Sequence, residues 1–413
     1  MRRLAWVLLW LFAFAVPWEF SLDPGPPWGN IARMAGLALL LVAIPALLQA
    51  GRLRKPGPLQ WLSLAYVLWL CCSSFWTIEL KDTLLEMRAY PQVMLAVWVV
   101  WEFADSAWDL RWLLRAFVAG SWVLAGLTVA NFASPEALAA GQVRFAAVGQ
   151  DPNDVARFLV LGLPLAALLL NCETGWRGRM LAMGYFPLGL LGVLLTASRE
   201  GLLAGLVGLA GSAVILTRLH PRRALAGAMA LPAVAVAIWL TVPRATLARL
   251  GTIPEELAGG DLNQRLKIWN AGWHAFARAP LLGSGAGTFV SAAGLSSIDT
   301  AHNTVLSVVV SGGLLGLFLV SLILVAVCIS ISETRGALRW AMGTALLVWA
   351  VTSLAAAVEE SRTTWLLFAL IALAGRLAIE DPAGLRSCFP DRGGEREAAA
   401  ASETPPGAMG VAG

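Results

Sequence analysis

The chain alternates between long apolar runs and short polar connections. Runs such as LLGVLLTA and VSLILVAVCI are apolar on every side, whereas a membrane-spanning β-strand alternates apolar and polar residues. Because a helix of about 20 apolar residues can cross a bilayer, the pattern predicts an all-α polytopic integral membrane protein with about 12 transmembrane helices. We place these helices at residues 4–18, 33–50, 61–77, 90–104, 112–131, 155–171, 180–197, 201–217, 224–242, 303–331, 339–357 and 364–380.

Composition supports this class and excludes others. The 413 residues are 58% hydrophobic and only 14% charged, against about 25% charged in an average soluble domain, which excludes a water-soluble globule. The net charge of +4 does not indicate a nucleic-acid partner, because membrane proteins gather Lys and Arg in cytoplasmic loops. The five cysteines show no CxxC spacing, so neither a disulfide framework nor a zinc site is expected.

The basic residues of the short loops fall on one side when the helices are counted in order. These residues are Arg2, Arg3, Arg52, Arg54, Lys55, Arg177, Arg179, Arg218, Arg222, Arg223, Arg335 and Arg339. The positive-inside rule makes that side cytoplasmic, and an even number of helices places both termini there. The N-terminal run resembles a signal peptide, but Pro17 argues against cleavage, so we expect the first helix to remain. We expect residues 1–389 to form a single transmembrane domain and 390–413 a disordered cytoplasmic tail.

One external connection is much longer than the others. Residues 243–302 carry a set of cations that the orientation rule does not explain, because this loop should lie outside the cytoplasm. The set comprises Arg244, Arg249, Arg265, Lys267 and Arg278. We therefore expect the function to reside in this long external loop.

Residues 261–279 of the loop have the pattern of an amphipathic helix on or near a membrane surface, with Asp261 as its N-cap. The apolar stripe consists of Leu262, Leu266, Trp269, Trp273 and Phe276. Arg265 lies at the edge of this stripe, so its guanidinium, a planar fork of donors suited to phosphate, should point to where the apolar face meets its partner. The alternative is an interfacial arginine that reaches lipid headgroups.

Arg199 and His302 are expected on the same external side. Arg199 lies in TASREG, a tight turn between two membrane helices, where the alternative is an Arg199–Glu200 pair that only marks the water boundary. His302 opens the helix after the long loop. Burial and a neighbouring Asp299 or Asn303 could set its pKa near neutrality, as a general base requires. A plain helix-capping role is equally open.

The remaining polar signals are weaker. The loop at 280–289 contains GxGxG, but no strand precedes it, which excludes a dinucleotide-binding site; tight turns and backbone amides facing a phosphate both stay open. Arg144 and Arg157 flank a helix start at 151–154, and the EESR turn at 359–362 is typical of a water boundary. No segment has metal-ligand spacing, so no metal is expected.

Four segments, taken in order, resemble the bacterial O-antigen ligase and O-antigen polymerase superfamily, and most closely O-antigen ligase. They are GQDPNDVARFLVLGLPLA, LLTASREGLLA, QRLKIWNAGWHAFARAPLLGSGAGTF and AHNTVLSVVVSGGLLGL. The likeness covers residues 140–330, and the first five predicted helices match only in hydropathy.

The resemblance implies a fold like that of the C-type membrane glycosyltransferases. It also implies a metal-independent, inverting glycosyl transfer in lipopolysaccharide biosynthesis that needs no cofactor. The donor would be a glycan linked to undecaprenyl diphosphate, and the acceptor a sugar hydroxyl of the lipid A core. The reaction would take place at the periplasmic face of the bacterial inner membrane, among membrane lipids and without nucleic acid.

The resemblance also assigns roles to residues. Arg199 and Arg265 match positions that bind the diphosphate, and His302 matches the general base. Further candidate contacts for donor or acceptor are Arg144, Arg157, Trp269 and Asn303.

Three other functions stay open. A polymerase would use the same donor and a growing glycan as acceptor, but such enzymes often carry two long arginine-rich external loops, and here one dominates. A protein O-glycosyltransferase is disfavoured by the lack of an evident appended domain. A secondary transporter would show inverted repeats and charges at the membrane midplane, whereas the unusual charges here lie at the external boundary.

Overall fold

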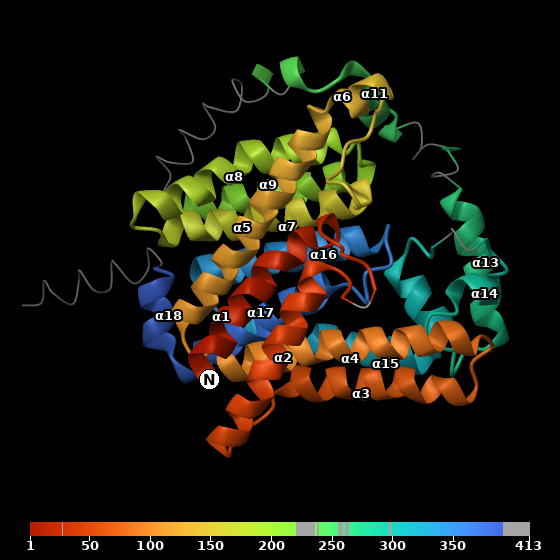
Figure 1. Ribbon diagram of the computed structural model, residues 1–413, viewed down its shortest axis with the longest axis horizontal. Coiled ribbons are helices and arrows are strands. Elements are labelled where there is room, and N and C mark those ends of the chain that lie inside the picture. The colour runs from red at the N-terminus through yellow and green to blue at the C-terminus, as the bar shows by residue number, and fades with distance from the viewer. Residues whose placement is uncertain are drawn as a thin grey trace, which may run out of the picture.

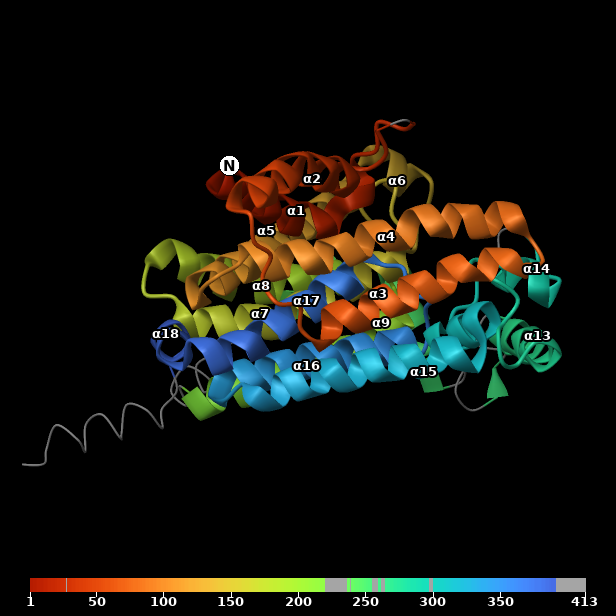
Figure 2. The same cartoon turned by 90° about the horizontal axis from the view of Figure 1, so that it is seen from below.

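Helices form every element in the described part of the chain, which comprises residues 1–26, 28–219, 236–237, 239–254, 259–260, 264–296 and 300–390 of a computed structural model (Figures 1 and 2). In chain order they are α1 (Arg2–Ala15), η1 (Val16–Ser21), α2 (Ile31–Ala50), α3 (Pro58–Cys72), η2 (Ser73–Phe75), α4 (Leu80–Phe103), α5 (Ala107–Phe132), α6 (Pro135–Ala139), α7 (Pro152–Cys172), α8 (Trp176–Leu195), α9 (Arg199–Leu219), α11 (Arg244–Gly251), α13 (Arg265–Arg278), α14 (Phe289–Ala293), α15 (Thr304–Glu333), α16 (Gly336–Ser353), α17 (Arg362–Glu380) and α18 (Pro382–Cys388). The helical class predicted from the sequence is confirmed.

Within these residues, nine stretches are long and apolar enough to cross a membrane. They are α1 with η1, α2, α3 with η2, α5, α7, α8, α9, α15 and α17. The predicted spans at 90–104 and 339–357 form α4 and α16, in which charged residues such as Glu86 and Arg339 lower the mean hydropathy. The predicted span at 224–242 lies almost entirely outside the described residues, so a total of 12 stays a prediction.

Two helices, α7 and α17, form the interior of the bundle. In their apolar windows 89% and 83% of the residues are buried, against 22% in α2 and in α15. Small residues allow this close packing, as they do at helix interfaces in membranes generally. At Gly162 of α7, for example, the side chain of Tyr185 from α8 lies so close that an added Cβ would sit 2.3 Å from its hydroxyl oxygen.

Ion pairs join the connections that the charge pattern places on one side of the membrane. Arg2 forms an ion pair with Asp105 at 2.9 Å, and Arg54 pairs both with Asp105, at 2.5 Å, and with Glu380, at 3.3 Å. The N-terminus, the loop after α2, the α4–α5 turn and the end of α17 therefore meet. In Figure 2, the N-terminus and α18 lie at one end of the bundle, while α13 and α14 lie at the other. The predicted long external loop thus lies away from the cluster predicted to be cytoplasmic.

The long external segment is built into the membrane bundle through α15. That helix is interrupted at Gly313, whose φ is +66°. The loop before α14 fits into the interruption: the amide of Ser284 donates to the carbonyl of Val310 at 2.8 Å, and the amide of Leu314 donates to that of Pro280 at 2.8 Å. Satisfying the freed backbone groups is what permits a broken helix at this depth.

Candidate functional site

Arg265, the first residue of α13, contacts the start of α9. Its Nη2 donates to Oε2 of Glu200 at 3.1 Å, and the two side chains are 18% and 7% exposed. The guanidinium therefore points toward the bundle, as its position at the stripe edge predicted. The sequence placed Glu200 only at a water boundary; the structure makes it the partner of Arg265.

Arg199 lies one residue earlier, in the turn that opens α9. Its Nη2 donates to Oγ1 of Thr252 at 2.6 Å, and its Nε donates to the carbonyl oxygen of Arg249 at 3.4 Å. The turn depends on Ala197, whose φ of +49° is left-handed, and on Ser198, whose Oγ accepts from the amide of Gly201 at 3.2 Å as a helix cap does. The two predicted phosphate-binding arginines thus meet at one helix terminus.

Arg144 enters the same region from the shorter external connection between α6 and α7. Its Nη2 donates to Oδ1 of Asn153 at 2.7 Å, and its Nε donates to the carbonyl oxygen of Thr196 at 3.1 Å. Burial lowers the pKa of Arg144; the positive charges of Arg249 and Arg265 lower it further, while nearby carboxylates oppose this. Several guanidinium groups therefore share one electrostatic environment.

Arg249, from α11, is a member of this group that the sequence did not single out as a site residue. It is partly buried, and its Nε has no hydrogen-bond partner among the described residues. Only its position in the cationic external loop hinted at a role. A buried guanidinium donor without an acceptor is costly unless something supplies one.

Arg157 has a partner within its own helix. It lies in the first turns of α7, is 8% exposed and forms an ion pair with Asp154. Asp151 caps the helix by accepting a hydrogen bond from the amide of Asn153 at 2.7 Å. The predicted helix start is therefore present, and Arg157 is paired within it.

His302 lies at the entrance to α15 in a left-handed conformation, with φ of +45°. Such a backbone is uncommon for a residue other than glycine and often marks a functional position. Asn303 is the N-cap: its Oδ1 accepts from the amide of Leu306 at 2.9 Å, and its Nδ2 donates to the carbonyl of Leu354 at 3.1 Å. Helix capping is thus performed by Asn303, the neighbour of His302.

The same structure relates His302 to Arg265. Helix α13 packs on α15, and Ile268 of α13 shares an apolar cluster with Ala301 and Leu306. His302 follows Ala301 directly, and Arg265 precedes Ile268 by one helical turn. Both predicted functional residues are therefore carried by one packed unit at the external end.

The predicted amphipathic helix is present as α13, beginning at Arg265; the predicted N-cap, Asp261, lies outside the described residues. The buried residues of α13 are Ile268, Gly272 and Ala275. Of the predicted stripe, Trp269 and Phe276 pack against the α14–α15 cluster, whereas Leu266 and Trp273 are 49% and 52% exposed. One part of the stripe thus packs on the protein and the other part is exposed. The reason is that the small residues Gly272 and Ala275 are the ones that bring the helix close to α15.

The GxGxG loop is stabilised within the protein. The amide of Gly285 donates to the carbonyl of Ser311 at 3.1 Å, and the amide of Ala286 donates to Oγ of Ser73 at 2.9 Å. Left-handed glycines in this loop fit against the break in α15, where a Cβ at Gly283 would lie 2.5 Å from the amide nitrogen of Gly313. Of the two alternatives, the structure favours tight turns.

The turn at 359–362, which the sequence indicated only as a water boundary, also makes contacts that join helices. Arg362 forms an ion pair with Glu19 at 2.7 Å, and the Nε1 of Trp365 donates to the carbonyl of Glu359 at 2.7 Å. Burial raises the pKa of Glu359 to about 7, and a hydrogen bond with Ser307 of α15 opposes that rise. The turn therefore holds the start of α15 against α17.

A comparison with protein families bears on this constellation. Residues 184–321 match the O-antigen ligase family. The matched range includes Arg199, Arg265 and His302, and it confirms the predicted resemblance to the O-antigen ligase and polymerase superfamily. No curated protein matches this chain. The family supports a glycosyltransferase-like membrane enzyme of the ligase or polymerase type, with a lipid-linked polysaccharide as substrate.

Proposed function

We propose that this protein is an O-antigen ligase. It transfers a polysaccharide from undecaprenyl diphosphate to a sugar hydroxyl of the lipid A core, at the periplasmic face of the inner membrane. The observation that carries the proposal is the meeting of Arg265 with the Arg199–Glu200 turn. Two further elements bring polar groups to this junction: the end of α11 and the loop before α7.

The guanidinium groups provide the site for the diphosphate. Arg199 and Arg265 bind it, and Arg144 and Arg249 add positive charge around them. Charge-assisted and bidentate hydrogen bonds from arginine suit phosphate oxygens, and preorganised donors stabilise the charge that develops on a leaving diphosphate. No step of this chemistry calls for a metal ion.

The contacts of the site without substrate fit this role. Arg265 bonds a carboxylate and Arg199 bonds a hydroxyl, so acceptor oxygens already occupy positions that phosphate oxygens would take. Oε1 of Glu200 and Nε of Arg249 are buried without hydrogen-bond partners among the described residues. A bound diphosphate would give the arginine donor its missing acceptor.

His302 acts as the general base. It takes the proton from the acceptor hydroxyl while that oxygen attacks the anomeric carbon of the donor sugar. The new glycosidic C–O bond forms as the bond between that carbon and the diphosphate oxygen breaks, and undecaprenyl diphosphate leaves. A single displacement of this kind inverts the anomeric configuration. Proton transfer by a positioned side chain contributes about 10²–10⁴-fold to such a step.

A polymerase is the second candidate, and one observation favours it. Arg144 reaches the cluster from the other external connection, so both connections supply arginine, as the superfamily's polymerases do. The donor site would be the same. The difference would lie in the acceptor, a growing glycan in place of the lipid A core.

The deciding experiment uses purified protein with a glycan linked to undecaprenyl diphosphate. In one reaction the acceptor is lipid A core, and in the other a second donor molecule. Product on lipid A core alone supports the ligase, and extension of the donor alone supports the polymerase. Absence of both products, together with solute flux in proteoliposomes, would point to a transporter and reject the proposal.

A further inference from the structure

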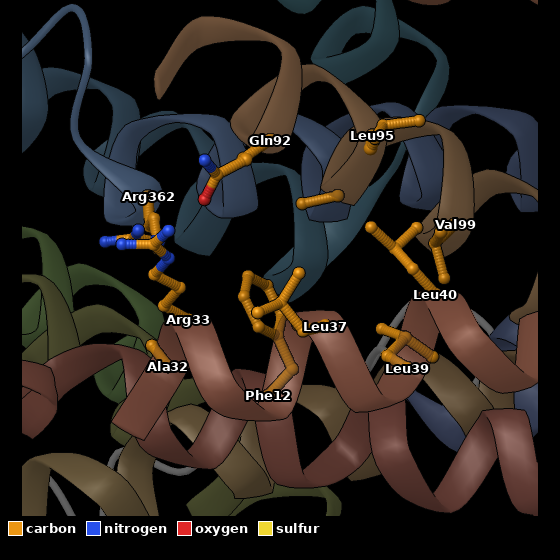
Figure 3. A pocket seen from close by; sticks show the side chains of 12 residues that line it. Phe12, Ala32, Arg33, Leu37, Leu39, Leu40, Gln92, Leu95, Val99 and Arg362 are labelled. Atoms are coloured by element: carbon orange, nitrogen blue, oxygen red, sulfur yellow. The ribbon is translucent and has the colours of Figure 1, made fainter. Parts of the chain in front are cut away.

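A groove lies between α1, α2, α4 and the first residue of α17 (Figure 3), and none of the residues proposed for the catalytic site lines it. Its walls are apolar, with Phe12 from α1, Leu37 and Leu40 from α2, and Leu95 and Val99 from α4. The groove is a shallow one: its empty space of about 400 Å³ includes volume that is open to the surroundings of the protein. Its apolar walls therefore offer a surface along which an alkyl chain can lie, with one side of the chain left uncovered.

One end of the groove is basic. Arg33, Arg362 and Gln92 all line the groove, and Figure 3 shows their polar groups at the same end of it. Like charges at short range repel, so an anion placed against both groups would stabilise the arrangement. The amide supplies an additional polar contact for a headgroup.

The charges at this end leave one cation uncompensated. Arg362 forms an ion pair with Glu19 at 2.7 Å, and the Glu19 side chain is only 3% exposed. The guanidinium of Arg33 has no hydrogen bond or ion pair within the described residues. Two arginines and one carboxylate thus give a net charge of one positive unit, which a singly charged anion would balance.

The apolar part of the groove faces the bilayer. Helix α2, which forms one wall, is the least enclosed of the candidate spans together with α15. Leu37 and Leu95, which line the groove, are 43% and 36% exposed. Further along α2, Leu41, Ile44 and Leu48 are 76%, 56% and 77% exposed, as lipid-facing residues are. A molecule with an alkyl chain can therefore enter from the membrane without crossing water.

We propose that this groove binds an anionic glycerophospholipid of the surrounding bilayer. The single negative charge of a phosphodiester matches the net charge at Arg33, Arg362 and Glu19, and one acyl chain lies along α2 and α4. Phosphatidylglycerol is the probe with this chemistry. Lipids with phosphate monoesters or diphosphates carry more negative charge than this end of the groove balances.

Native mass spectrometry tests the site directly. The protein is placed in nanodiscs with equal amounts of phosphatidylcholine and phosphatidylglycerol, then released into mild detergent. One phosphatidylglycerol should stay bound in preference to phosphatidylcholine. Because a hydrogen bond to a charged group is worth about a tenfold or greater change in affinity, Arg33→Gln should lower this retention about tenfold or more.

Two further variants make the test specific. Arg88→Gln removes an exposed arginine from α4 that does not line the groove, so retention should not change. Ala96→Trp fills the groove while leaving Arg33 in place, and it should also displace the lipid. Equal retention by Arg33→Gln and Arg88→Gln, or equal retention of phosphatidylcholine, would overturn the proposal.

A competition experiment addresses other lipids. Lipid A and undecaprenyl diphosphate are added separately to protein that holds phosphatidylglycerol. Continued retention of phosphatidylglycerol supports the proposed occupant, and its displacement at equal concentration would contradict it. Because these readouts measure binding and not transfer, they are independent of the outcome for the proposed ligase activity.

Discussion

Arg265 and Glu200 form an ion pair at 3.1 Å although 65 positions separate them in the chain. The pair joins the amphipathic helix of the long external segment to the helix that begins at Arg199. Each residue lies at the start of its helix, where the backbone amides present a partial positive charge. The carboxylate of Glu200 therefore compensates positive charge at the two helix starts, and a diphosphate bound there would take over that role.

The first prediction concerns the shape of the Arg265 side chain. Arg265→Lys keeps the charge but loses the planar fork, so transfer should fall about tenfold or more. Lys267→Ala, on the exposed side of the same helix, should have a mild effect. Initial rates with a lipid-diphosphate-linked glycan measure both variants, and equal, mild losses would remove the phosphate role.

The second prediction concerns the buried donor on α11. Arg249→Gln should weaken donor binding about tenfold, since a charge-assisted contact is lost. Arg244→Gln, at an exposed position of the same helix, is the matched control and should leave it unchanged. Titration of labelled donor measures affinity directly. If the two variants bind the donor equally well, Arg249 does not face the diphosphate.

The third prediction separates chemistry from binding. His302→Ala should lower the rate of transfer about 10²–10⁴-fold, because no base remains for the acceptor hydroxyl, while donor affinity and thermal stability stay close to those of the unmodified protein. His274→Ala removes an exposed histidine of α13 and should be active. Substantial turnover by His302→Ala would exclude the general-base role.

The fourth prediction tests the packing of the bundle interior. Gly162→Ala places a methyl group 2.3 Å from the hydroxyl oxygen of Tyr185, which is fully buried and donates to the carbonyl of Leu159 at 2.7 Å. Overpacking of this kind costs about 1–3 kcal/mol. Gly126→Ala has nothing within 4 Å of the added methyl and should not destabilise. Thermal unfolding in detergent compares them.

The fifth prediction concerns pH. The pKa of Glu359 is raised from 4.5 to about 7 by burial, so the folded protein holds a proton that the unfolded chain releases. This contribution to stability is complete below pH 4.5 and is lost as pH rises through about 7. The melting temperature should therefore fall between these values, and Glu359→Gln should reduce the fall. Glu333→Gln, at an exposed site, should not change it.

Hydropathy was sufficient to predict most of the helices, because an apolar helix is stable in a bilayer whether its sides contact lipid or other helices. It also placed Arg199, Arg265 and His302 at one end, since helix lengths fix where loops emerge. The partners of these residues were not predictable. The contacts of Arg265 with Glu200 and of Arg199 with Thr252 depend on how α9, α11 and α13 pack against one another. The hydropathy or periodicity of a short segment does not predict such packing.

The surface of α13 shows the same limit. Periodicity correctly indicated a helix with one apolar stripe, but it assigned equal weight to every large apolar residue. In the structure, Gly272 and Ala275 face α15 and large Trp273 does not, because close helix contact requires small side chains. Arg249 was missed for a related reason: its burial results from the placement of α11.

The loop held in the break of α15 has a mechanical consequence. The amide of Ser284 bonds the carbonyl of Val310, and the amide of Leu314 bonds the carbonyl of Pro280. Because Ile268 also shares an apolar cluster with Ala301, residues 264–296 are attached to α15 at more than one point. Arg265 and His302 would therefore move together with the part of α15 that precedes Gly313, while Arg199 would stay with α9. If the site widens to admit a bulky lipid-linked glycan, α13 and α15 would move away from α9. The ion pair between Arg265 and Glu200 would have to break for this movement.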